Sequence, residues 1–340
     1  MNPAGHARVY GRLAYPAALR GYSVAVVGRK GSRTPAGPIK TVELDYRGRG
    51  RLLNHAALIN AAIGLKARIY HVHSPELLPL AAVLKKIRGA KIVYDVHENY
   101  VLNALTAGGY RFRQTLAAAV AKVEIRFAPM LDGVVLAEKS FWDLPFLSRA
   151  GGPVVACPNY FAPPAHAPSL SPEYIASLGE YLLYTGTLSE KWGTDAAVRA
   201  AKKMGAKIVV AGHTHNGRYF ERLRRLADGA NAVFIGGTRY VDYADIVALI
   251  AGCRAGFALY HPDPNLVRRR PTKFFEYAAF GKPLYYTDAW ADERVYGVPV
   301  PFPADDFSFP PPPPPVPPRP GRPYAPFDPV DELYRRLLNG

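Results

Sequence analysis

The fold class that the sequence predicts is α/β, and three observations predict it. Short apolar segments alternate with helical patterns along most of the chain, as in parallel sheets with crossover helices. Residues 161–180 are rich in proline, alanine and serine, which is typical of a linker. The chain has 340 residues, the length of two ordinary domains. Together these features predict two Rossmann-like domains in tandem.

The first domain is expected at residues 1–160. Its helix at 75–89 has a proline in the first turn and stops at a glycine, the usual places for these residues. The segments typical of strands are 22–28, 67–74, 90–98, 132–140 and 152–160, and those typical of helices are 52–66, 75–89 and roughly 110–130.

The second domain is expected at residues 181–305, after the linker. Its predicted strands are 181–186, 206–212, 232–237, 255–261 and 282–288, with helices at 193–204, 217–227, 242–252 and 272–280. A proline-rich segment follows at 306–328, and its run at 310–323 favours a solvated polyproline conformation. Residues 329–340 predict a closing amphipathic helix.

Composition excludes several classes of protein. The chain is 49% hydrophobic and 21% charged, which indicates a folded protein rather than a disordered one. Its two cysteines, Cys157 and Cys253, cannot form a disulfide framework and fit a reducing compartment. No run of 18 apolar residues and no signal-peptide pattern is present. We therefore expect a cytoplasmic protein.

The positive charge is concentrated in the first half of the sequence. Residues 1–160 hold 22 Lys and Arg against 9 Asp and Glu, whereas residues 161–340 hold 21 against 18. Such a difference favours an anionic partner of the first domain, and an anionic membrane surface and nucleic acid both qualify. No nucleic-acid recognition motif accompanies the charge, so we expect no nucleic acid. A peripheral position at the inner face of a membrane, and solubility alone, both stay open.

Candidate site residues follow the predicted strands, because ligands of open parallel sheets bind beyond the carboxyl ends of the strands. The residues in this position are His73, His97, Gly186, Gly212, Gly236 and His261.

Residues 261–288 contain the sharpest local pattern. Arg268, Arg269, Arg270 and Lys273 crowd the N-terminus of the helix predicted at 272–280, where the helix dipole disfavours cations. A bound phosphate would make this arrangement favourable. Glu276 lies on the same face as Lys273 and can accept hydrogen bonds from sugar hydroxyls. The alternative is a solvated basic face with an internal Lys273–Glu276 pair.

Several segments resemble, in order, the retaining glycosyltransferases of family 4, also called group 1, which have the GT-B fold. PTKFFEYAAFGKP (271–283) resembles their donor-nucleotide motif, and the remaining segments are RVYGRLAYPAALRGYSVAVVG (8–28), IVYDVHENY (92–100), VVACPNYF (154–161), LLYTGTLSEKWG (182–193) and IVVAGHTHNG (208–217). The resemblance implies two Rossmann-like domains facing a cleft. The first would bind the acceptor and the second the nucleotide-sugar donor.

The resemblance also implies the roles of individual residues. Glu276 would bind the ribose, Lys273 the diphosphate, and His97 would line the cleft as the catalytic-site residue. The other implied donor-binding residues are Gly186, Lys191, Gly212, Asn265, Arg270 and Thr272. For His97, the alternative is a satisfied histidine at the end of a core strand.

The implied reaction transfers a hexosyl group from a UDP- or GDP-linked sugar to a hydroxyl, with retention of configuration. A lipid-linked or glycan acceptor is expected, in glycolipid, polysaccharide or glycoprotein glycan synthesis. The pairs His71/His73 and His213/His215 would need a third ligand to hold zinc, so no metal and no cofactor besides the donor substrate is expected.

Three departures from the family pattern keep other functions open. Arg268 stands where a second glutamate is common, and Thr187 and Trp192 stand where two basic residues are common. A non-catalytic partner subunit of the same fold, or a nucleotide-sugar epimerase, is the alternative. The family's first strand also has no counterpart before the helix at residue 8. This predicts about 10–20 further residues upstream, a strand length with a short loop.

Overall fold

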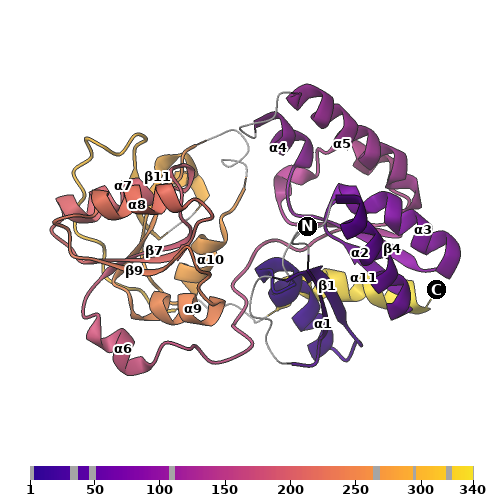
Figure 1. Cartoon of the computed structure of the whole chain (residues 1–340), viewed down its shortest axis with the longest axis horizontal. Coiled ribbons are helices and arrows are strands. Elements are labelled where there is room, and N and C mark those ends of the chain that lie inside the picture. Colours follow the sequence, from indigo (N-terminus) through magenta and orange to yellow (C-terminus); the bar gives the residue numbers. More distant parts are fainter. Residues whose placement is uncertain are drawn as a thin grey trace. The chain divides into compact units, whose positions relative to one another are not determined.

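The computed structural model describes residues 4–30, 37–45, 51–106, 112–262, 269–293, 296–318 and 324–339. The chain divides into two compact units (Figure 1). The first consists of Met1–Ala162 together with Tyr324–Gly340, and the second of Pro163–Pro323. Both are built on parallel sheets, which confirms the predicted α/β class.

The main sheet of the first unit has four parallel strands in sequence order. They are β3 (Ile69–Val72), β4 (Lys91–Val96), β5 (Gly133–Leu136) and β6 (Val154–Ala156). One face packs against α3 (Leu78–Arg88), since Ile92, Tyr94 and Val96 share a core with Leu78 and Leu84. Both faces are covered, as is usual for parallel sheets, and the strands are accordingly rich in apolar residues.

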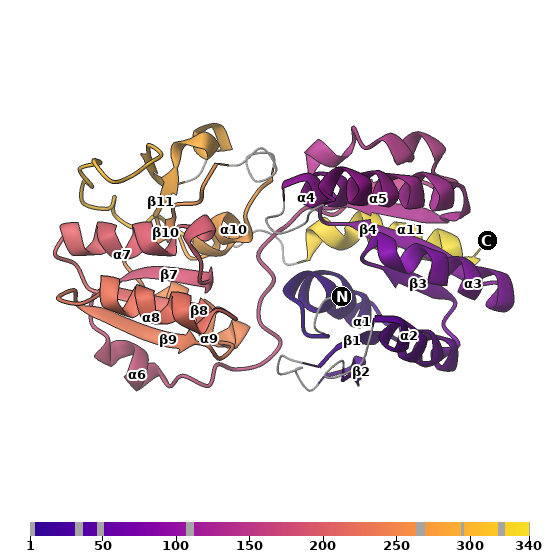
Figure 2. The ribbon, with the colours of Figure 1, turned by 45° about the horizontal axis from the view of Figure 1, so that its top comes forward.

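Helix α11 (Asp328–Asn339) and the N-terminal helices cover the other face of this sheet (Figure 2). Those helices are a π-helix at Ala7–Ala14 and α1 (Tyr15–Leu19). Val330 and Leu333 pack with Val93 and Val135, and a Cβ on Gly133 would lie only 2.8 Å from a methyl carbon of Leu333. The closing helix therefore belongs to the core of the first unit.

A second, two-stranded sheet stands beside the main one. In it, β1 (Ala25–Arg29) pairs in parallel with β2 (Lys40–Leu44). Within the described residues no strand joins this pair to β3, the edge strand of the main sheet. The expected upstream strand stays a prediction. The remaining helices of the unit are α2 (Arg51–Leu65), α4 (Tyr100–Thr106) and α5 (Arg113–Phe127).

The second unit has six parallel strands in the order β12-β11-β10-β7-β8-β9. The strands are β7 (Leu182–Thr187), β8 (Ile208–His213), β9 (Ala232–Gly237), β10 (Ala255–Ala258), β11 (Leu284–Thr287) and β12 (Gly297–Val300). Helices α7 (Thr194–Lys203) and α8 (Gly217–Leu226) cover one face, and α9 (Tyr243–Gly252) and α10 (Thr272–Ala279) the other (Figure 1). The order of the strands reverses between β7 and β10, where parallel sheets bind ligands.

Of the segment expected as a linker, 161–180, residues 163–180 belong to the second unit. They contain a short helix, α6 (Pro172–Ser177), which Ser171 caps. Asp245 of α9 accepts hydrogen bonds from the amides of Ser169 and Leu170, at 2.6 and 2.8 Å. The proline-rich segment also contacts this unit, because Tyr285 donates to the carbonyl of Pro310 at 2.6 Å. The functions assigned to the domains stay predictions.

Among the described residues, no helix has the length and hydrophobicity needed to cross a membrane.

Candidate functional site

Lys273 lies at the strand-order reversal of the second unit, in the first turn of α10. Its Nζ atom is 4.1 Å from the ring centroid of Tyr184, on β7, and 5.2 Å from that of Tyr260, just after β10. A Cβ on Gly186 would lie 3.6 Å from the Cε of Lys273, so the glycine and the lysine are neighbours. Two predicted donor-binding residues are thus brought together at the carboxyl end of β7.

The Lys273 ammonium is held in a largely apolar place. The residue is 8% exposed, and its burial lowers its pKa to about 7, whereas the Glu276 carboxylate acts in the opposite direction. The faces of Tyr184 and Tyr260 favour the cation. The protonated form of this buried lysine is stabilised when an anion binds beside it, so the site is suited to phosphate.

Glu276 follows Lys273 on the buried side of α10. The residue is 6% exposed, and one carboxylate oxygen accepts a hydrogen bond from the Tyr243 hydroxyl at 3.3 Å. Tyr277 holds the helix in place by donating to the carbonyl of Leu183 at 3.2 Å. The carboxylate and the ammonium are therefore both positioned by packing of α10 on β7 and on α9.

Two glycines allow the strand ends to approach one another. Gly186 has φ of 101°, in the region that favours glycine. A Cβ on Gly212 would lie 1.8 Å from the carbonyl oxygen of Gly186, which no side chain could tolerate. Gly212 therefore has a packing reason of its own, beside its predicted role in donor binding.

The remaining predicted donor-binding residues lie in or near the N-terminus of α10, after β7, or outside the described residues. Thr272 is the first residue of the helix and is half-buried, and Arg270 is exposed two residues before it. Lys191 has an exposed side chain, while its carbonyl accepts from the His261 amide at 3.1 Å. Asn265 lies outside the described residues, as does Arg268.

In the first unit, Asp95 gathers several basic side chains at the end of β4. The Arg8 guanidinium bonds both carboxylate oxygens, at 2.6 to 3.1 Å, and donates to the carbonyl of Cys157 at 3.0 Å. His73 Nδ1 is 3.0 Å and His97 Nδ1 3.3 Å from Asp95 Oδ2. Asp95 is fully buried, yet Arg8 and the two histidines hold its pKa well below the ordinary value.

His97, the predicted catalytic-site residue, is oriented by this carboxylate. Its Nε2 atom is 3.3 Å from the hydroxyl of Tyr100, which also donates to the carbonyl of His73 at 2.7 Å. The His97 side chain is 11% exposed, so it is reachable from one direction only. A carboxylate on one ring nitrogen and a hydroxyl on the other fix the plane of the ring.

The structure supplies a third potential ligand to the pair His71 and His73. Ligand atoms of these histidines and of Asp95 lie within 4.8 Å of one another. However, Asp95 is bound by Arg8, and His71 Nδ1 is 2.5 Å from the Tyr334 hydroxyl. The adjacent guanidinium opposes a further cation, so the donor set does not fit a metal well. The absence of a metal stays a prediction.

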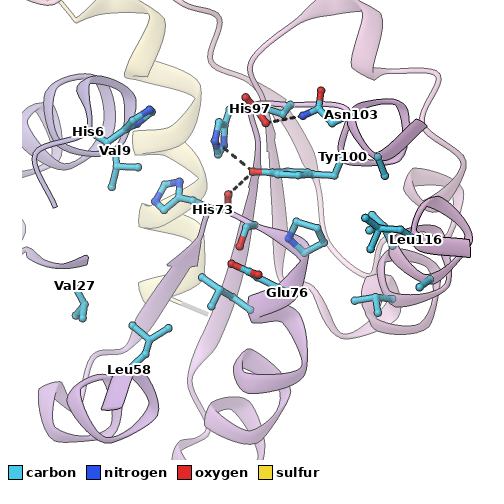
Figure 3. A pocket seen from close by; sticks show the side chains of 18 of the residues that line it. His6, Val9, Val27, Leu58, His73, Glu76, His97, Tyr100, Asn103 and Leu116 are labelled. Atoms are coloured by element: carbon cyan, nitrogen blue, oxygen red, sulfur yellow. Dashed lines mark hydrogen bonds between the residues drawn. The ribbon is translucent and has the colours of Figure 1, made fainter. Parts of the chain in front are cut away.

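A cavity of about 550 Å³ opens beside His97 within the first unit (Figure 3). His73, His97 and Tyr100 gather in one part of it, and Leu116 lies apart from them on α5 (Figure 3). Its lining also includes His6, which is half-buried and whose pKa is lowered to about 3 by desolvation and by nearby basic groups. The cavity therefore has a cluster of polar groups and extended apolar walls.

Sequence reasoning missed several residues of both sites. One signal was available for Asp95: a charged residue inside an otherwise apolar strand is almost always paired when buried. The basic partner Arg8 and the aromatic partners Tyr100, Tyr184 and Tyr260 had no such signal, because only the folded chain brings them to these sites.

No model of a known protein family matches the chain. No curated protein matches it significantly. Solved structures do match. A sucrose-phosphate synthase from Thermosynechococcus elongatus has a TM-score of 0.61 at 14% identity, over 98% of this chain and 83% of that chain. A glycosyltransferase from Rickettsia africae ESF-5 has a TM-score of 0.55 at 14% identity, over 89% and 82%.

HepE from Anabaena, in its complex with UDP-glucose, is a further similar structure. Its TM-score is 0.52 at 16% identity, over 79% of this chain and 74% of that chain. At such identities the likeness shows the fold, and the predicted GT-B fold is thereby confirmed.

Proposed function

We propose that the protein is a glycosyltransferase that transfers a hexosyl group from a nucleotide sugar to a hydroxyl acceptor. The observation that carries the proposal is the group formed by Lys273, Glu276 and Gly186 at the strand-order reversal of the second unit. The family-4 resemblance and the fold it shares with a UDP-glucose complex support the same conclusion.

Each member of this group has a chemical task in the proposed reaction. The diphosphate of the donor forms an ion pair with the Lys273 ammonium and accepts hydrogen bonds from the backbone amides at the N-terminus of α10. Glu276 accepts hydrogen bonds from the ribose hydroxyls. Because negative charge grows on the diphosphate as the sugar leaves, preorganised positive groups there stabilise the transition state.

His97 serves the acceptor side in this proposal. Its Nε2 atom faces the cavity of the first unit beside Tyr100, where an acceptor hydroxyl would be oriented. The transfer is proposed to retain the configuration of the anomeric carbon, as the family resemblance implies. A UDP-linked or GDP-linked sugar is the proposed donor.

A thermal-shift screen against UDP-, GDP- and ADP-linked hexoses tests the proposal. A ligand at about 100 times its Kd stabilises the folded protein by about 2.7 kcal/mol, which gives a clear shift. We expect one nucleotide class to stabilise the second unit and its sugar to be released slowly by hydrolysis. No response to any nucleotide sugar would refute the proposal, whereas binding without turnover would favour a non-catalytic subunit.

A further inference from the structure

Helix α5 carries an apolar stripe that lines a cavity, and its inner end, at Val123, also packs against the core of the first unit. Leu116, Ala119, Val120 and Val123 follow one another at helical spacing, so they share one face of the helix, and all four line the cavity. Phe112 is the N-cap residue, directly before the helix, and does not line the cavity itself. The core side of α5 is a different one, marked by the buried residues Ala117 and Glu124.

The stripe leads from the surface into the cavity. Phe112 is 74% exposed and Leu116 37%, whereas Val120 and Val123 are half-buried. Exposed aromatic and aliphatic side chains in a row are uncommon unless something covers them. The remaining apolar lining is supplied by other elements of the same unit, and its members are Val9, Val26, Val27, Leu58, Leu77 and Ala104.

The charges around the cavity favour an uncharged ligand. Among the described lining residues there is no lysine or arginine, and the two carboxylates are those of Glu76 and Glu98. Arg8 stands nearby but is bound to Asp95. A phosphate would approach two carboxylates, and the described part of the lining offers it no lysine or arginine, so an anionic head is disfavoured.

The polar groups of the cavity suit a hydroxyl. The rings of His73 and His97 lie against Asp95. The Tyr100 hydroxyl donates to the His73 carbonyl, and its oxygen, which is 3.3 Å from His97 Nε2, keeps one further lone pair for a ligand hydroxyl. In Figure 3 these three side chains lie together, apart from Leu116. A cavity of about 550 Å³ is within the usual size range for small-molecule sites.

We propose that this cavity binds an uncharged amphipathic alcohol, with its hydroxyl-bearing head beside His97 and Tyr100 and its hydrocarbon chain along the α5 stripe. The inference rests on the proposed function, in which this alcohol is the acceptor. It narrows the acceptor from any hydroxyl compound to one with a neutral head and a long apolar chain.

Calorimetric titration with hexyl, octyl and decyl β-glucoside, each below its micelle concentration, tests the inference without the donor. Each buried methylene should tighten binding roughly fourfold. Decyl phosphate should bind at least roughly tenfold more weakly than decyl glucoside, since its charge meets Glu76 and Glu98. Affinity that is independent of chain length, or equal for phosphate and glucoside, would overturn the inference.

A matched pair of variants locates the binding. Ala119 and Ala118 are adjacent and both exposed, but only Ala119 lines the cavity. Ala119→Trp should fill the cavity and lower the affinity for decyl glucoside more than tenfold, whereas Ala118→Trp should leave it unchanged. Equal affinities for the two variants would contradict the proposed position of the chain.

The response to UDP-glucose separates this inference from the proposed function. A wild-type protein that is stabilised by UDP-glucose but binds no alkyl glucoside would overturn the inference and leave the proposed function standing. A protein that binds the alkyl glucosides but no nucleotide sugar would remove the acceptor role while supporting the cavity assignment.

Discussion

Lys273 is held where an ammonium is poorly solvated, and this has a cost for stability. Its pKa in the folded protein is about 7, against an ordinary value of 10.5. Between these two values the unfolded chain binds the extra proton, so the free energy of unfolding rises as the pH rises through this window. Below about pH 7 the lysine is protonated in both states, and the full penalty applies.

Lys273→Met should therefore stabilise the protein while abolishing donor binding. We expect a gain of about 1–3 kcal/mol near pH 7, less than the whole pKa shift because Glu276 loses a neighbouring cation. The gain should vanish as the pH approaches 10.5, the ordinary lysine value. Calorimetric unfolding at several pH values measures the gain near pH 7 and its decrease with pH, and the exposed Lys203→Met variant serves as the control. A variant with lower stability at pH 7 would contradict this account.

At the scale of elements, a buried ion pair fastens the N-terminal π-helix to the end of β4. Arg8 is 3% exposed and Asp95 fully buried, so removing one partner leaves an uncompensated charge in the interior. The same helix is bound a second time, because Arg12 donates to the Tyr160 carbonyl at 2.7 Å. The ion pair thus links the N-terminal helix to the end of β4, directly before His97.

Arg8→Met should lower the free energy of unfolding by about 3–5 kcal/mol. Because Arg8 keeps the pKa of Asp95 well below its ordinary value, the wild-type pair contributes stability above that ordinary value and loses it only as the pH falls through the depressed one. Denaturant unfolding of the variant at neutral pH gives the change, with the exposed Arg149→Met as a reference. A loss no larger than that of the reference would show that the pair is dispensable.

Most elements could be predicted from the sequence because their hydrophobic patterns and helix boundaries are clear. The strands β2 and β12 were not predicted. Pro299 lies inside β12, and a proline argues against a strand except at the edge of a sheet, which is where β12 lies. For the site, Lys273 and Glu276 were found through a sequence motif. Their aromatic neighbours were not, since contacts distant in sequence leave no local pattern.

At the scale of the whole molecule, the excess of positive charge lies in residues 1–160, which belong to the first unit. A surface of this kind attracts anionic lipids over a distance that salt shortens to about 8 Å at physiological ionic strength. We expect the protein to sediment with anionic vesicles at low salt and to be released as salt is raised. Equal sedimentation with neutral and anionic vesicles would disprove an electrostatic attachment.

Glu276 and Lys273 are proposed to form a nucleotide-sugar site at the strand-order reversal of the second unit. Glu276 is the more decisive residue to change, because it is the group proposed to bind the ribose of the donor. Each hydrogen bond to a charged group is worth about 1.5–3 kcal/mol, so Glu276→Ala should weaken donor binding and slow transfer by roughly tenfold to a hundredfold or more. The exposed Glu221→Ala serves as the control.

The test measures the rate at which the nucleoside diphosphate is released from the donor that the thermal-shift screen identifies. It is carried out on the wild type and on both variants. We expect release by the wild type and by Glu221→Ala, and a loss of at least roughly tenfold for Glu276→Ala with the fold retained. Release by Glu276→Ala at the wild-type rate, with unchanged donor affinity, would contradict the site.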